Sequence, residues 1–278
     1  MGRRLGQHFL ADPGILDRIV DALEPDPSDV VIEIGPGRGT LTKRLAPRVG
    51  HVVAVEKDVG LADRLVDEQA GARDGRGQAG LENVRVVPGD ALDLDWAQLL
   101  GSSPPYPSPL TPHGFKVIGN IPYYITTPLI DKALSPPLPT MVVFLVQKEV
   151  ADRLAAAPGS KTYGALSAGV QAVASVERLF IVKKGAFRPP PKVDSALMRL
   201  RPLAQPLVSE PERDRWRQFL AQLFSQRRKQ LGRSLRAVTG RSKETVGQWL
   251  DQLVIDPAAR PELLEPQALV RLFRAVAR

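Results

Sequence analysis

The chain has 278 residues, of which 43% are hydrophobic and 24% charged, with a formal net charge of +8; this is typical of a globular protein with one large and one smaller domain. Cysteine is absent and only three histidines occur, which excludes disulfides, thiolate nucleophiles and cysteine-ligated zinc and argues against a metal site. No apolar run reaches the roughly 18 residues of a membrane span and no secretory signal follows Met1, so we predict a cytoplasmic protein without membrane contact.

The positive charge is concentrated near the carboxyl end of the chain. Residues 204–278 hold 14 Lys and Arg against 8 Asp and Glu, whereas the remaining residues hold 24 against 22. A lobe that faces a polyanion has this distribution, although a solvated helical surface also produces it. The charge therefore favours nucleic-acid binding by the last quarter of the chain.

Short β-branched runs alternate with helical patterns from Val30 onward. The predicted strands are Val30–Ile34, Val52–Val55, Val84–Val87, Phe115–Ile118 and Met141–Val146. The predicted helices are Thr40–Arg48, Gly60–Gln69, Thr127–Leu134, Lys148–Ala157 and Tyr163–Ala174. This rhythm predicts an α/β fold with a parallel, doubly wound, Rossmann-like sheet.

The end of the sheet and the inserts have their own signals. Arg178–Val182 and Ala196–Arg201 form a late strand pair with no helix between them, which predicts an antiparallel end of the sheet. The polar, Gly- and Pro-rich inserts Gly71–Gly80 and Gly101–Gly114 are predicted to be surface loops.

After Pro202–Pro211 the pattern becomes entirely helical. The predicted helices are Glu212–Ser225, Arg228–Val238, Lys243–Leu250 and Pro266–Val276. We therefore predict two domains, residues 1–203 with the sheet and residues 204–278 as a small all-helical domain.

Polar or glycine-rich features follow three successive predicted strands. The segment Glu33–Gly39 holds the pattern G-x-G-x-G after the first strand, with Gly35 and Gly37 placed for close approach of a ligand. Glu56 closes the second strand and can accept both hydroxyls of a ribose, and Asp90 after the third strand can accept from an adenine amine. Such a turn serves dinucleotides and S-adenosylmethionine alike.

The tetrapeptide Asn120-Ile121-Pro122-Tyr123 at the end of the fourth strand favours S-adenosylmethionine over NAD. It suits alkylation of the exocyclic amine of a flat base, because the Asn120 side-chain oxygen and the Ile121 carbonyl can accept the two N–H bonds of that amine. Pro122 fixes φ near −65°, and Tyr123 offers a stacking face. A proline-terminated strand leading into a helix, with Tyr124 in the core, is the alternative interpretation.

Six motifs stand in the order seen in ribosomal RNA adenine N6,N6-dimethyltransferases, and the chain resembles the small-subunit branch of this family most closely from about Arg4 to Arg236. These motifs are Gly6–Leu10, Glu33–Gly39, Glu56–Asp58, Gly89–Ala91, Asn120–Tyr124 and Phe187–Ser195, and Ser225–Leu231 resembles the helical-domain motif of that branch.

The resemblance implies an S-adenosylmethionine-dependent methyltransferase. His8, Leu10 and Gly35 would line the amino-acid end of the cofactor, Glu56 would hold its ribose and Asp90 its adenine. Asn120 would lie between the cofactor and the target base. The family often has Asn at position 8, so His8 is a departure whose hydrogen bonding depends on pH.

The resemblance also implies the RNA contacts. Phe187 would stack on the target base opposite Tyr123, after the adenine is unstacked or flipped out. The basic helix would bind phosphates without reading sequence; its residues are Arg227, Arg228, Lys229, Arg233 and Arg236.

The implied reaction is dimethylation of N6 on two adjacent adenosines near the 3′ end of small-subunit (16S) rRNA by a monomer, with a role in rRNA processing and ribosome biogenesis. The implied partner is the rRNA or a precursor of the small ribosomal subunit. Three alternatives remain open: a large-subunit rRNA adenine methylase of the macrolide-resistance type, a non-catalytic RNA-binding assembly factor, and an NAD-dependent dehydrogenase.

Overall fold

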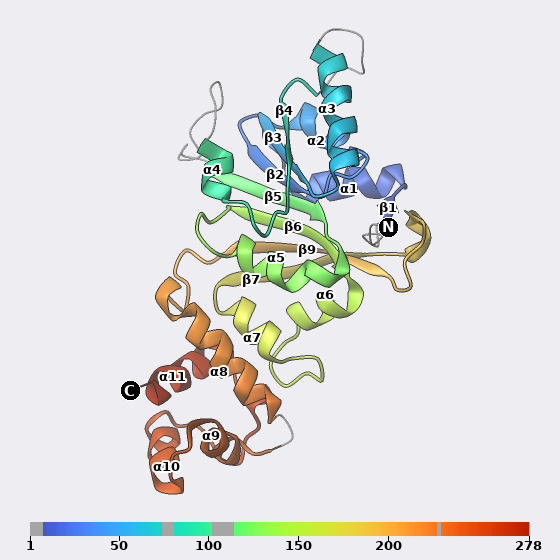
Figure 1. Ribbon diagram of the computed structural model, residues 1–278. Coiled ribbons are helices and arrows are strands. Elements are labelled where there is room, and N and C mark those ends of the chain that lie inside the picture. The colour runs from blue at the N-terminus through green and yellow to red at the C-terminus, as the bar shows by residue number, and fades with distance from the viewer. Residues whose placement is uncertain (1–7, 74–80, 102–113, 227–228, 278) are drawn as a thin grey trace. The chain divides into compact units, whose positions relative to one another are not determined.

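The computed structural model describes residues 8–73, 81–101, 114–226 and 229–277 (Figure 1). The chain packs as two compact units, the first comprising Met1–Ala151 and Glu177–Pro202 and the second Asp152–Val176 and Leu203–Arg278. Packing thus groups residues 152–176 with the C-terminal helices. The division into functional domains at residues 203 and 204 stays a prediction. The predicted surface loops fall largely on residues 74–80 and 102–113, outside the described residues.

The first unit is built on a seven-stranded sheet with the order β4-β3-β2-β5-β6-β9-β7. Its strands are β2 (Val30–Ile34), β3 (His51–Glu56), β4 (Val84–Pro88), β5 (Phe115–Asn120), β6 (Met141–Gln147), β7 (Ala174–Val182) and β9 (Ser195–Pro202). Strands β2 to β6 pair in parallel and β9 runs antiparallel to β6. The predicted parallel sheet with an antiparallel end is confirmed.

The strand order reverses between β2 and β5. Strands β3 and β4 extend from β2 in one direction, whereas β5 and β6 extend in the other, and Ile34 is in register with Gly119. Every residue of β2 is buried, as expected for a central parallel strand covered on both faces. The carboxyl ends of β2 and β5 therefore form the crevice in which α/β sheets bind their ligands.

Six helices belong wholly or mainly to this unit, as far as its residues are described. They are α1 (Pro13–Ala22), α2 (Thr42–Leu45), α3 (Val59–Arg73), α4 (Trp96–Gly101), α5 (Thr126–Ala133) and α6 (Lys148–Leu154). The continuous helix predicted over Thr40–Arg48 is wrong, because α2 ends at Leu45 and Ala46–Arg48 form a 3₁₀ turn. Pro47 lacks the N–H that an α-helix would use there.

A separate two-stranded sheet joins distant parts of the first unit. Strand β1 (Phe9–Leu10) pairs antiparallel with β8 (Phe187–Arg188), so that Phe9 faces Arg188 and Leu10 faces Phe187. The Ala11 N–H donates to the Ala186 carbonyl at 2.9 Å and extends this pairing. Leu10 and Phe187 both belong to the main hydrophobic core, so this pairing is anchored by buried side chains.

The second unit is helical, apart from the first residues of β7. Its helices are α7 (Ala165–Gln171), α8 (Arg213–Ser225), α9 (Leu231–Thr239), α10 (Lys243–Gln252) and α11 (Pro266–Val276). Trp216 and Phe219 of α8 pack on Phe273 of α11, with ring centroids 5.6 and 5.7 Å from it. Among the described helices, none combines the length and apolar character needed to span a membrane.

A paired ion contact between α11 and the residues before α8 stabilises the second unit. Arg274 donates from Nε and Nη2 to the two carboxylate oxygens of Glu212, each at 3.0 Å. Hydrogen bonds from Arg274 and Ser209 lower the pKa of Glu212 to about 2. Glu212 therefore contributes its stabilisation above its unfolded pKa and loses it as the pH falls through about 2.

Helix α10 ends in a six-to-one turn that has valine where glycine is preferred. The Ile255 N–H donates to the Leu250 carbonyl and the Val254 N–H to the Asp251 carbonyl, with Val254 at a φ of 56° and 92% exposed. A β-branched side chain is strained in this left-handed conformation.

We expect Val254→Gly to raise the free energy of unfolding by about 1 kcal/mol, because it relieves that strain and exposes no core. Urea unfolding followed by circular dichroism measures it. The control is Val246→Ala, at a buried position of the same helix, which should destabilise; a loss of stability in Val254→Gly would contradict the assignment of strain.

Candidate active site

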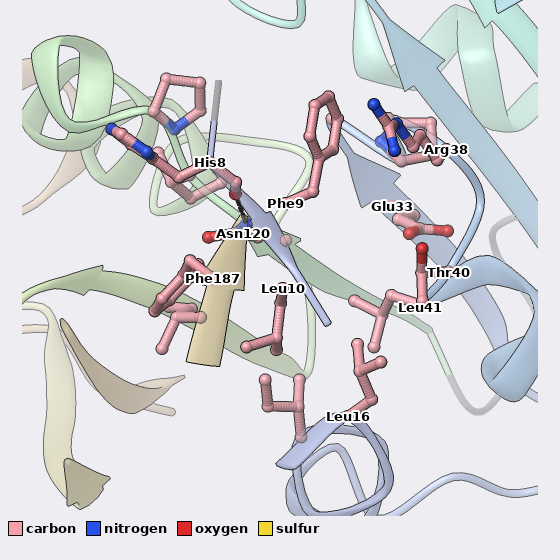
Figure 2. Close-up of a pocket in the computed structure, with 18 of the residues that line it drawn as sticks. His8, Phe9, Leu10, Leu16, Glu33, Arg38, Thr40, Leu41, Asn120 and Phe187 are labelled. Carbon is pink, nitrogen blue, oxygen red and sulfur yellow. Dashed lines mark hydrogen bonds between the residues drawn. The ribbon is translucent and has the colours of Figure 1, made fainter. Parts of the chain in front are cut away.

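A pocket lies at the carboxyl ends of β2 and β5, at the point where the strand order reverses. Figure 2 shows His8, Asn120 and Phe187 on one side of it and Glu33, Arg38 and Thr40 on the other. The lining includes every predicted cofactor or catalytic residue except Asp90, namely His8, Leu10, Gly35, Gly37, Glu56, Asn120, Ile121, Pro122, Tyr123 and Phe187. The sequence motifs therefore converge on one cavity.

The glycine-rich loop after β2 is held in a fixed conformation by Glu56. Gly35 and Gly37 have φ values of 68° and 59°, which a residue with a Cβ adopts only with strain. One carboxylate oxygen of Glu56 accepts from the Gly37 N–H and the other from the Asp58 N–H, each at 2.9 Å. Glu56 is thus buried and oriented, while each oxygen retains further acceptor capacity.

Glu33 is a second buried carboxyl in the pocket, and the sequence analysis gave it no role beyond marking the loop. It is 1% exposed, and its Oε2 has no hydrogen-bond partner among the described residues. Burial raises the pKa of Glu33 to about 7, the nearby Thr42 hydroxyl opposes this shift, and the Glu56 carboxylate adds to it. The position of Glu33 next to the glycine loop was the sequence signal that could have identified it.

The side-chain amide of Asn120 is oriented by the backbone of the N-terminal segment. Its Nδ2 donates to the His8 carbonyl oxygen at 3.0 Å, drawn as a dashed line in Figure 2. Because the carbonyl can only accept, the NH₂ group points to His8 and leaves Oδ1 as the acceptor for a ligand.

The residues after Asn120 are held in place by the neighbouring strand and a tight turn. The Ile121 N–H donates to the Leu145 carbonyl at 3.1 Å, and no described residue donates to the Ile121 carbonyl. Pro122 has a φ of −56°, close to the predicted value. A second acceptor is therefore available beside Asn120.

Tyr123 lines the pocket beside His8. Its hydroxyl lies 2.9 Å from the Ser195 Oγ, and burial raises its pKa. The His8 and Tyr123 rings have centroids 6.1 Å apart, and His8 Nδ1 lies 2.9 Å from the Pro189 carbonyl oxygen. Since that oxygen only accepts, Nδ1 carries the proton.

Phe187 lines the same pocket from β8 but is only 1% exposed and belongs to the core. It is thus both a core aromatic and part of the pocket wall. Its function as a second stacking face stays a prediction.

Asp90 is not part of the pocket lining. Its Oδ2 accepts from the Lys57 ammonium at 2.6 Å and its Oδ1 from the Leu92 N–H at 3.0 Å. Burial raises the pKa of Asp90, but the hydrogen bonds from Lys57 and Leu92 outweigh it, so the pKa lies below its usual value. Asp90 is therefore ionised and already engaged by a cation.

Phe9 and Arg38 also line the pocket and were not singled out from the sequence. The Arg38 guanidinium carbon lies 4.5 Å from the centre of the Phe9 ring, within range of a cation–π interaction. A Cβ on Gly37 would lie 3.1 Å from that ring. Phe9 stands inside the motif Gly6–Leu10, and this position in the motif was the sequence signal that could have identified it. Gly6 and Gln7 of the motif lie outside the described residues.

The predicted phosphate-binding residues belong to the second unit. Lys229, Arg233 and Arg236 are exposed, whereas Arg227 and Arg228 lie outside the described residues. The prediction of a helix from Arg228 is wrong at its start, because α9 begins at Leu231. Lys229 therefore precedes the helix that carries Arg233 and Arg236.

The sequence pattern of a family described as ribosomal RNA adenine dimethylase matches residues 2–277. The chain belongs to the ribosomal RNA adenine dimethylase family. Among its relatives, the ribosomal RNA small subunit methyltransferase A of Nostoc sp. is 43% identical over 96% of this chain and 94% of its own length. That of Nitrosococcus oceani is 38% identical over 98% and 94%.

Solved structures agree with this membership in the dimethylase family. A dimethyladenosine transferase from Plasmodium falciparum has a TM-score of 0.74 at 28% identity, covering 95% of this chain and 96% of its own. The 23S rRNA methyltransferase ErmE has a TM-score of 0.70 at 28% identity, covering 97% and 100%.

We expect Gly37→Ala to weaken binding of S-adenosylhomocysteine by about tenfold or more, because the residue must keep a positive φ and its Cβ would displace Phe9. Isothermal titration calorimetry measures this binding. Gly185→Ala, where a Cβ has nothing within 4 Å, is the control, and equal affinity of both variants would contradict the role of the loop.

Proposed function

We propose that this chain transfers methyl groups from S-adenosylmethionine to N6 of two adjacent adenosines near the 3′ end of small-subunit (16S) rRNA. The observation that carries this proposal is the orientation of Asn120, whose Nδ2 is fixed by the His8 carbonyl. Its free Oδ1 and the free Ile121 carbonyl are two acceptors side by side in sequence, matching the two N–H donors of an adenine amine.

The residues of the pocket fit the cofactor. Gly35 and Gly37 of the loop present bare backbone to the pocket, and the buried Glu56 keeps acceptor capacity for two ribose hydroxyls. Leu10 and His8 supply the wall at the predicted amino-acid end. When bound, the cofactor supplies an electrophilic methyl group on a sulfonium. The positive sulfonium suits the two buried carboxyls Glu33 and Glu56 of a lining that also contains Arg38.

The residues of this chain contribute to the reaction chiefly by positioning the target adenine. In the first transfer, acceptance of both N–H bonds by Asn120 and Ile121 draws the adenine nitrogen toward tetrahedral geometry and frees its lone pair from the ring; in the second, one N–H bond remains to be accepted. Tyr123, whose hydroxyl is held by Ser195, presents a ring on which the base stacks. Orientation of this kind accelerates a reaction without a prior proton abstraction.

The same two acceptors explain why the product is released after two methyl transfers. The first methylation removes one N–H donor and the second removes the other, so that the product satisfies neither Asn120 nor Ile121. Buried acceptors without donors are costly. Release is therefore favoured after dimethylation, and the proton lost at each step passes to water.

The proposed substrate is the rRNA of the small ribosomal subunit. A relative named as a small-subunit methyltransferase is 43% identical to this chain, and the 23S rRNA methyltransferase ErmE is 28% identical. The basic residues of the second unit would bind phosphates of the rRNA or of a subunit precursor. We propose a monomer that acts during small-subunit biogenesis.

The first test is transfer of labelled methyl from S-adenosylmethionine to small ribosomal subunits that lack the modification. Dimethyladenine in the small subunit alone is the expected result. Labelling of large-subunit RNA would instead support the resistance-type methylase, and cofactor binding without any transfer would support an assembly factor.

Asn120→Ala is expected to lower kcat by about 100-fold or more, because it removes one acceptor of the reacting amine. Binding of S-adenosylhomocysteine should change by less than about threefold, since Glu56 and the loop are untouched. Single-turnover methylation and calorimetry measure the two quantities, and unchanged turnover would refute the assigned role.

Replacement of Lys229, Arg233 and Arg236 by Gln should weaken rRNA binding and reduce the slope of log affinity against log salt by about 2 to 3. Filter binding over a salt series measures this. A matched triple replacement at Arg215, Arg260 and Arg271, which are also exposed, removes the same charge; an equal effect there would contradict a localised site.

A further inference from the structure

The ion pair between Lys57 and Asp90 lies at the position proposed for the cofactor's adenine. Lys57 directly follows Glu56, the proposed ribose ligand, and its ammonium donates to Asp90 Oδ2 at 2.6 Å. The other carboxylate oxygen accepts from the Leu92 N–H, and the Asp90 side chain is only 17% exposed. An adenine amine that donates to Asp90 therefore approaches an acceptor that Lys57 occupies.

Release of Lys57 costs little, and Asp90 retains another positive charge nearby. The Lys57 side chain is 51% exposed, and an ion pair of such exposure contributes little stability. Lys132 also acts on Asp90 as a nearby positive charge, and its ammonium is held by the Leu92 carbonyl at 2.8 Å. The carboxylate thus keeps a fixed cation nearby when it exchanges Lys57 for an adenine amine.

An exposed aromatic ring stands in the turn that follows Tyr123 of the pocket. Tyr124, which the sequence analysis placed in the core as one interpretation, is 61% exposed and interacts electrostatically with Lys57. It follows Tyr123 of the pocket in a turn closed by the Ile125 N–H and the Pro122 carbonyl. An exposed ring in the turn that follows the pocket offers a face on which a nucleobase can stack.

We propose that Lys57 couples cofactor binding to RNA binding: an adenine amine displaces its ammonium from Asp90, and the ammonium then binds an RNA phosphate while Tyr124 stacks on a base that flanks the target adenine. Asp93 also acts on Lys57 as a negative charge. It therefore competes with the RNA phosphate for the Lys57 ammonium but does not prevent the exchange. The inference rests on the proposed function, because it takes the cofactor's adenine to bind at Asp90.

The coupling is measured as a thermodynamic cycle with S-adenosylhomocysteine, which cannot donate a methyl group. We expect the protein to bind unmodified small ribosomal subunits roughly fivefold more tightly at saturating S-adenosylhomocysteine than without it. In Lys57→Met the ratio should fall to about 1, while affinity for S-adenosylhomocysteine alone is kept or increased. Equal ratios in both proteins would overturn the proposal.

Matched variants separate this coupling from a general loss of charge or fold. Lys43→Met removes a lysine from another exposed ion pair of the same unit, with Glu68 at 2.7 Å, and should retain the coupling. Tyr124→Ala should weaken subunit binding by about tenfold and leave affinity for S-adenosylhomocysteine unchanged. Weaker binding of S-adenosylhomocysteine in Tyr124→Ala would assign the ring to the cofactor and overturn the RNA half.

The two levels of proposal fail in different ways. If the unaltered protein does not bind S-adenosylhomocysteine, the proposed function fails. If it binds S-adenosylhomocysteine and subunits, but each independently of the other, the proposed function stands and only the coupling is overturned. Thermal unfolding of each variant confirms that the folded protein is being compared.

Discussion

The hydrogen bond from Asn120 Nδ2 to the His8 carbonyl is the interaction on which the site depends. Asparagine has an almost symmetric side chain, and only its partner decides which end faces a ligand. Here the partner is backbone, held in place because His8 precedes β1 and β1 pairs with β8. The chemistry at the end of β5 thus depends on β1 and β8, two short strands outside the seven-stranded sheet that contains β5.

The pocket combines this oriented amide with two buried carboxyls of different character. Glu56 accepts two backbone N–H groups, whereas Glu33 has a buried oxygen without a partner and a pKa raised to about 7, chiefly by burial. Two carboxyls in one cavity favour a ligand that brings positive charge, because that ligand offsets both their desolvation and their mutual repulsion. Under the proposed function, the burial of these groups contributes to the affinity for a sulfonium compound.

Sequence patterns predicted the parts of this structure that depend on local chemistry. Central strands such as Val30–Ile34 are apolar throughout because both faces are covered, and Gly35, Glu56 and Asn120 follow strands whose carboxyl ends meet. The β1–β8 pairing was beyond such reasoning, since two-residue strands have no periodicity and their contact joins Phe9 to Arg188 and Leu10 to Phe187, far apart in the sequence. Helix α1 was also missed, although Asp12 caps it and Pro13 begins it. Asp90 was recognised as an acceptor, but its pairing with Lys57 depends on the path of two loops and has no sequence signal.

The β1–β8 sheet also has a consequence for when the protein becomes competent during its own synthesis. The segment that orients Asn120 is synthesised before β5, whereas Phe187 and Pro189, which hold that segment, are synthesised after β5 and β6. Strand β9, which completes the sheet next to β6, follows later still. A nascent chain therefore exposes its glycine loop and Asn120 without a fixed His8 carbonyl, and an unfinished protein lacks the oriented acceptor. The oriented acceptor therefore forms only after β8 has been made.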